Sequence, residues 1–94
     1  MSNVELLKEV EYVEVESEGI FSPEHALFSL EGIETVSKVT DENKLPINSN
    51  GDLYIASNTI TQKFEIYEFL GITSVDVDAH FFTFRKVGYL CPTL

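Results

Sequence analysis

The chain has 94 residues, with 16 carboxylate side chains against six lysines and arginines, and a formal net charge of -10. This charge argues against nucleic acids and anionic membrane surfaces as ligands, because both are bound by clusters of basic side chains. At 44% hydrophobic residues, the chain is nevertheless too apolar to be an acidic disordered tail. We therefore expect a single acidic domain over residues 1–94, whose charge either keeps it soluble or faces a basic partner.

Sequence motifs that would indicate chemistry are absent. The chain contains no glycine-rich phosphate loop, no dinucleotide-binding pattern and no nucleophile elbow. His25, His80 and Cys91 do not have the paired spacing of metal ligands, and a single cysteine allows no internal disulfide. The start of the chain has no basic segment or long apolar run, so neither a signal peptide nor a membrane span is expected. We expect a protein that is not an enzyme and holds no metal or cofactor.

Residues 9–16 alternate glutamate with valine and tyrosine, which is typical of a β-strand. The alternation slips by one position at Tyr12-Val13, which predicts a β-bulge there. A helix that places Leu6, Val10 and Val13 on one face is the alternative for this segment.

Two helices are predicted further along the chain. Ser22 followed by a proline is a helix start, and Gly32 is expected to end that helix. Thr59 and Gln62 have the spacing of a capping box, and Gly71 is expected to end the second helix.

The remaining strands are predicted at residues 33–39, 52–56 and 72–85, with a short further strand at 87–90. The order is strand, helix, strand, strand, helix, strand. This order predicts an α+β fold of the ferredoxin-like βαββαβ type, with a four-stranded antiparallel sheet and both helices on one face.

Carboxylates on the first and last predicted strands are the main candidates for a binding surface. With the bulge in place, the glutamates of residues 9–16 share one outer face, and neighbours along it lie about 6–7 Å apart. Asp76 and Asp78 alternate with valines on the last strand, which adjoins the first in the predicted fold. A solvated polar face is the alternative explanation of this pattern. The predicted partner-binding carboxylates are Glu9, Glu11, Glu14, Glu16, Glu18, Asp76 and Asp78.

Aromatic side chains gather near the end of the chain. Phe81 and Phe82 are adjacent, so strand geometry sends them to opposite faces and leaves one off the main core unless the tail covers it. Phe82, Phe84 and Tyr89 are therefore candidate contacts of a homodimer.

The small size, the acidity, the strand-rich start and the phage-like lysine and isoleucine usage resemble the Arn family of anti-restriction proteins from T-even bacteriophages. The resemblance implies a homodimer in the cytoplasm of the infected bacterial host, with carboxylates that imitate DNA phosphates. It implies as targets the restriction endonuclease McrBC and the nucleoid protein H-NS, each blocked at its DNA-binding surface without chemistry. The residues assigned above come from strand alternation and not from the resemblance.

Two functions follow as hypotheses. The first is an anionic decoy that binds basic DNA-binding proteins in a salt-dependent way and does not bind DNA. The second is a small interaction or regulatory module that binds through its aromatic edge, with an affinity that depends little on salt.

Overall fold

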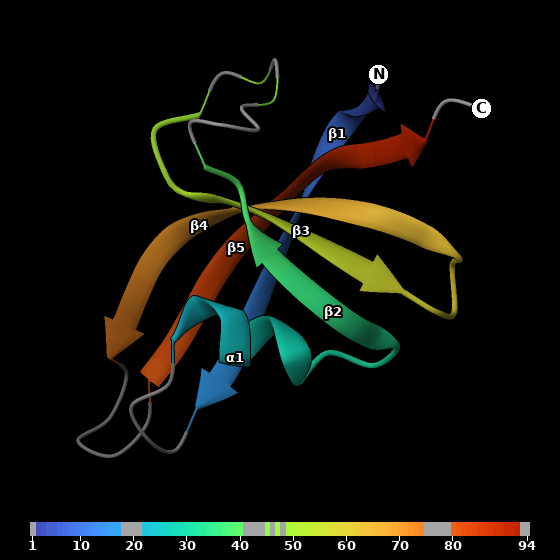
Figure 1. Ribbon diagram of the computed structural model, residues 1–94. Coiled ribbons are helices and arrows are strands. Elements are labelled where there is room, and N and C mark those ends of the chain that lie inside the picture. Colours follow the sequence, from blue (N-terminus) through green and yellow to red (C-terminus); the bar gives the residue numbers. More distant parts are fainter. Residues whose placement is uncertain are drawn as a thin grey trace.

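The computed structural model describes residues 2–17, 22–40, 45, 47, 49–74 and 80–92. They form one five-stranded antiparallel sheet, with the strands in the order β1-β5-β4-β3-β2, and one short helix (Figure 1). The predicted four-stranded ferredoxin-like fold with two helices is therefore wrong. The elements are β1 (Ser2–Ser17), α1 (Pro23–Phe28), β2 (Ile33–Lys38), β3 (Leu53–Asn58), β4 (Lys63–Ser74) and β5 (His80–Pro92).

The first segment is a strand, as predicted, but it is longer than residues 9–16 and pairs with β5 along most of its length. Its register against β5 shifts between Leu6 and Glu11, not at Tyr12-Val13. From Glu11 onward the pairing is regular, so side chains alternate between the two faces without interruption. The predicted bulge is therefore misplaced, and the helical alternative is wrong.

The helix start at Ser22 is confirmed. The Ser22 side chain accepts a hydrogen bond from the backbone N–H of His25, and Pro23 follows as the first helical residue. The helix ends at Phe28, earlier than predicted. Gly32 then adopts a φ of +87°, which glycine tolerates without strain, and its carbonyl accepts from Thr59 at the end of β3.

The second predicted helix, which Thr59 and Gln62 were expected to start, is the strand β4. Asn58 Oδ1 accepts hydrogen bonds from the backbone N–H groups of Ile60 and Thr61 at 2.9 and 3.2 Å, which makes the capping-box segment a tight turn between β3 and β4. Gln62 completes the turn with a φ of 59°. The apolar residues of β4 fall on both faces of the sheet, and this produces spacings that resemble a helix in the sequence.

Two small cores lie on opposite faces of the sheet. On the face that carries α1, called here the helix face, a cluster forms from Val15, Ala26, Leu27, Tyr54, Ala56, Tyr67, Phe82 and Phe84. On the other face, called the far face, Leu53, Ile66 and Val87 pack with Val39, Leu45 and Ile47, which lie at the end of β2 or in the connection to β3. Adjacent residues such as Ile66 and Tyr67 thus face different cores.

The strands predicted at residues 33–39 and 52–56 correspond to β2 and β3. The strand predicted at residues 72–85 is wrong, because it joins the end of β4 to the start of β5. The chain after residue 85 continues β5 instead of forming a separate strand. Within the described residues, no helix is long and apolar enough to span a bilayer.

Candidate functional site

The exposed part of β1 carries two carboxylates on the far face. Val13 and Val15 lie opposite Phe84 and Phe82 of the helix-face core, so the intervening residues point the other way. Three exposed side chains therefore follow one another on the far face, and we call them the β1 row: Tyr12, Glu14 and Glu16. Tyr12 is 66% exposed, and the two carboxylates are about 6–7 Å apart along the strand.

The other predicted carboxylates of β1 are placed differently. Glu11 faces the helix side of the sheet, where a carboxylate oxygen lies 3.2 Å from Lys86 Nζ. Glu9 is exposed and falls in the register shift. The predicted single face of four glutamates is therefore wrong, because the pairing with β5 puts the irregularity before Glu11. Glu18, Asp76 and Asp78 lie outside the described residues.

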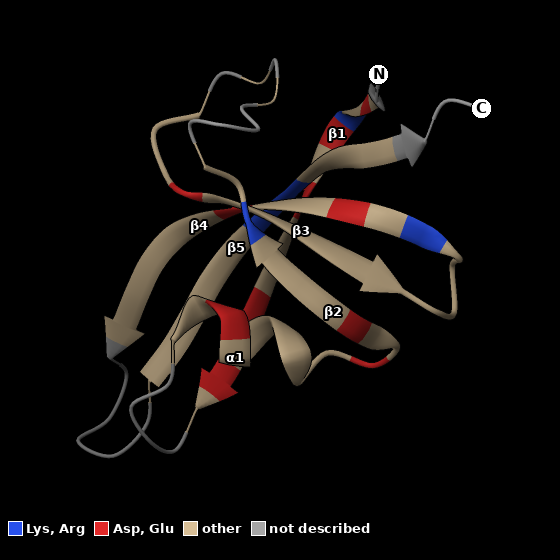
Figure 2. Cartoon of the chain, in the orientation of Figure 1, with Lys and Arg blue, Asp and Glu red and all other residues tan. Residues whose placement is uncertain are grey.

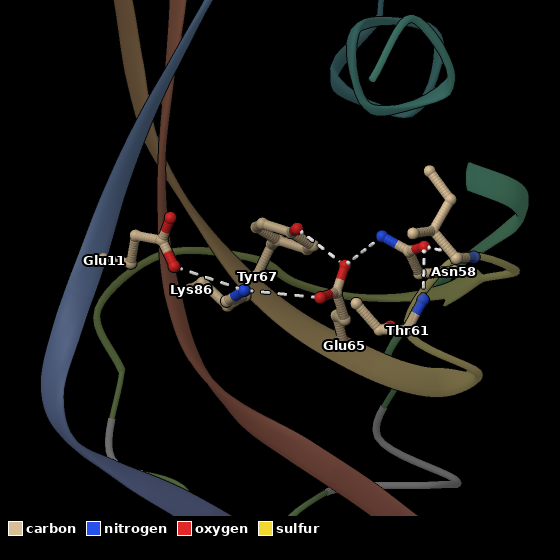
Figure 3. A network of polar contacts seen from close by, with 7 residues as sticks. Glu11, Asn58, Thr61, Glu65, Tyr67 and Lys86 are labelled. Carbon is tan, nitrogen blue, oxygen red and sulfur yellow. Dashed lines mark hydrogen bonds and ion pairs between the residues drawn. The ribbon is translucent and has the colours of Figure 1, made fainter. Parts of the chain in front are cut away.

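A buried polar network adjoins the helix-face core (Figure 3). Glu65 of β4 is only 2% exposed, and its Oε1 accepts hydrogen bonds from Asn58 Nδ2 at 3.1 Å and from the Tyr67 hydroxyl at 3.0 Å. Its Oε2 lies 3.3 Å from Lys86 Nζ, which also contacts Glu11. Because a buried carboxylate without partners is strongly destabilising, this set of donors is what allows Glu65 to be internal.

The network shifts the protonation of its members. Burial raises the pKa of the Tyr67 hydroxyl, and the charge of Glu65 and the hydrogen bond to it raise this pKa further. Burial alone would lower the pKa of Lys86. The hydrogen bond to Glu11 and the charge of Glu65 outweigh that effect, so the pKa of Lys86 is raised. Both shifts favour the hydroxyl and ammonium forms at neutral pH.

A second buried carboxylate organises the turn before β3. Glu68 Oε2 accepts hydrogen bonds from the backbone N–H groups of Asn50 and Gly51 at 3.0 and 3.1 Å. Its Oε1 is bound by a terminal nitrogen of Arg85. Glu68 therefore neutralises Arg85 and fixes the turn, and it is not available to a partner.

These contacts decide which acidic groups remain without a counter-charge. Arg85 pairs with Glu68, and Lys86 lies between Glu65 and Glu11. Lys38 Nζ lies 3.4 Å from Asp52, and Lys63 Nζ lies 4.6 Å from the centre of the Tyr89 ring. Lys8 is exposed on β1. Over the part of the chain that is described, no cation pairs with the two carboxylates of the β1 row. Figure 2 shows acidic positions along β1 that continue to the end of the strand.

The predicted dimer contacts are mostly internal. Phe82 and Phe84 are buried in the helix-face core, where Phe84 meets Tyr67 edge-on and Phe69 at a centroid distance of 5.4 Å. α1 covers this face, so these two rings cannot form a partner surface in the folded chain. Tyr89 is half-buried, and its ring lies beneath the Lys63 and Lys86 ammonium groups.

Sequence reasoning missed the two buried glutamates. Glu65 and Glu68 lie three residues apart and suggest a solvated helix face when β4 is interpreted as a helix. The available signal was the adjacent pair Arg85-Lys86 in an otherwise apolar strand, because buried cations require acidic partners.

One pocket and the acidic and histidine side chains of the described residues were the remaining places for a bound group. A pocket of about 500 Å³ on the far face is lined by Asn50, Gly51, Asp52, Glu68, Leu70 and Arg85, but the oxygens of Glu68 are already bound. In the described ranges, no group of three or more His, Cys, Asp or Glu side chains could hold a metal ion.

Comparison with protein-family models, with curated proteins and with solved structures finds no match for this chain.

Proposed function

We propose that the chain is an acidic decoy that occupies the DNA-binding surface of basic proteins and excludes DNA without chemistry. The observation that carries the proposal is the β1 row, whose two carboxylates are exposed, fixed on a strand and without a cation among the described residues. Lysine and arginine side chains that bind DNA phosphates form the same charge-assisted hydrogen bonds with carboxylates.

The internal ion pairs support this proposal. Arg85 pairs with the buried Glu68, and Lys86 pairs with the buried Glu65 and with the exposed Glu11. Neither cation compensates the exposed charge on Glu14 and Glu16. The end of β1 that carries Glu14 and Glu16 therefore keeps a negative potential that attracts basic proteins and repels DNA. By the resemblance described above, the targets we propose are a restriction endonuclease of the McrBC kind and a nucleoid protein of the H-NS kind, met in the cytoplasm of an infected bacterium.

The test is a gel-shift competition in which the chain is added to a complex of DNA with an H-NS-type protein at two salt concentrations. We expect the chain to displace DNA at low salt, to lose potency at high salt, and never to shift DNA alone. Inhibition of DNA cleavage by a McrBC-type nuclease gives the same test for the second target.

A charge-matched pair of variants shows whether the β1 row is responsible. Glu14→Lys with Glu16→Lys should abolish displacement. Glu31→Lys with Glu34→Lys changes the net charge equally at exposed positions near and on β2, the opposite edge of the sheet, and should retain most of the activity. Equal loss in both variants would show that only net charge matters, and no loss in either would refute the proposal.

A further inference from the structure

β1 is an edge strand, with β5 on one side only. In an antiparallel pair, every second residue directs its N–H and C=O groups away from the neighbouring strand. From Glu11 to Glu16, no hydrogen bond from elsewhere in the described chain reaches this free side. This edge is regular and is exposed at Glu11, Tyr12, Glu14 and Glu16, whereas Val15 is buried. A free edge of this kind is a template for pairing with another extended segment.

A groove runs beside the same stretch of β1. It has a volume of about 340 Å³. Its lining comes from the end of β1 (Val15, Glu16 and Ser17) and from α1 and its cap (His25, Ala26, Phe28 and Ser29). Its walls are mainly apolar, and Phe28 is 45% exposed there. The groove borders the helix face, toward which Val15 points, whereas strand alternation directs Glu14 to the far face. Glu16 belongs to the β1 row and also lines the groove.

We propose that the free edge of β1 binds an extended segment of a basic partner as a sixth strand of the sheet. The proposal rests on the decoy function and specifies how the partner is held. Residues of the added strand would lie about 4.5–5.5 Å from those of β1, face for face. One set of alternate side chains would meet Glu14 and Glu16, and the other would enter the groove beside Val15. The segment recognised therefore alternates basic with apolar residues.

Charge selects such a partner over a second copy of this chain. Antiparallel pairing of two β1 edges would bring glutamates of one copy close to those of the other, and opposed like charges destabilise a strand pair. Lysine or arginine opposite the carboxylates removes this repulsion. Tyr12, exposed in the same row, offers its ring face to a further arginine.

The test uses the full chain and a labelled synthetic peptide of about eight residues, a typical strand length, in which lysine and valine alternate. Two further peptides carry N-methyl groups on alternate backbone nitrogens, one in each register. Only one register places N–H groups toward β1, so one methylated peptide should bind at least about tenfold more weakly than the parent and the other should bind like it. A peptide of the same composition with its lysines and valines in two blocks should also bind weakly.

Variants and amide exchange locate the binding. Phe28→Ala should weaken binding of the alternating peptide. Phe64→Ala, which changes a side chain of similar exposure (41%) on β4, should leave that binding unchanged. Hydrogen exchange should slow on peptide binding at those backbone amides between Glu11 and Glu16 that point away from β5; the alternate amides are already bonded to β5. The amides of β2, the other edge of the sheet, should not change.

The results separate this inference from the decoy function. Equal binding of the two methylated peptides, or of the blocked and alternating peptides, overturns strand addition even if the chain still displaces DNA. If the chain fails to displace DNA, but N-methylation weakens peptide binding in one register only, strand addition is retained and the decoy function is wrong.

Discussion

The contact between Lys86 and Glu65 allows a sharp test of which charges stabilise the fold. The Lys86 side chain is 14% exposed and Glu65 is 2% exposed, so Lys86→Met leaves a buried carboxylate with only its two neutral donors, from Asn58 and Tyr67. Removing one partner of a buried ion pair costs about 3–5 kcal/mol. We expect a loss of about 3 kcal/mol, the lower end of that range, because those donors remain.

A loss of this size is a large fraction of the stability of a small domain, which is about 5–15 kcal/mol. The assay is urea unfolding followed by far-ultraviolet circular dichroism at neutral pH, since the chain contains no tryptophan. Lys38→Met is the matched control, because Lys38 and its partner Asp52 are 49% and 56% exposed. It should cost less than about 1 kcal/mol.

Glu65→Gln distinguishes the charge from the hydrogen bonds. Glutamine keeps an oxygen for Asn58 and Tyr67 but turns an amide donor toward Lys86, so it should destabilise the wild-type chain. In the Lys86→Met background the same substitution removes a buried charge and should recover about 1 kcal/mol or more. The reasoning is refuted if Lys86→Met costs no more than Lys38→Met, or if Glu65→Gln has the same effect in both backgrounds.

Three further predictions concern the sheet and the turn before β3. Glu68→Ala removes the acceptor of the turn and should lower the free energy of unfolding by about 3 kcal/mol, measured by urea titration; a loss below about 1 kcal/mol would contradict the role of this carboxylate. Gly51→Ala should cost about 1–3 kcal/mol, because the new methyl would overlap the backbone oxygen of Phe69, and an unchanged midpoint would show that the turn can move. The raised pKa values of Tyr67 and Lys86 contribute stability that is complete below about pH 10 and is lost as the pH rises through the folded-state values. Tyr67→Phe should therefore flatten the decline of the urea midpoint above about pH 10, and an unchanged slope would assign the decline to other groups.

Local patterns in the sequence correctly predicted part of the structure. The alternation in residues 9–16 predicts a strand because Val13 and Val15 pack on the helix-face core while the residues between and beside them, Tyr12, Glu14 and Glu16, are exposed. Ser22 before Pro23 predicts the helix start, since a side-chain oxygen and a fixed φ act within a few residues. β2 and β3 are predicted from equally local patterns of β-branched and aromatic residues.

The chain alone determined the excess of negative charge, because charge is a sum over residues and needs no fold. Tertiary structure decided where that charge is exposed. Glu65 and Glu68 are internal because their cationic partners, Lys86 and Arg85, come from β5, 21 and 17 residues away in the sequence. Glu11 lies on the other face from the β1 row because its pairing with β5 sets the register. The sequence does not show that β4 is a strand, because apolar side chains cover both faces of the sheet at its centre. Burial on both faces removes the period-two alternation that distinguishes a strand from a helix.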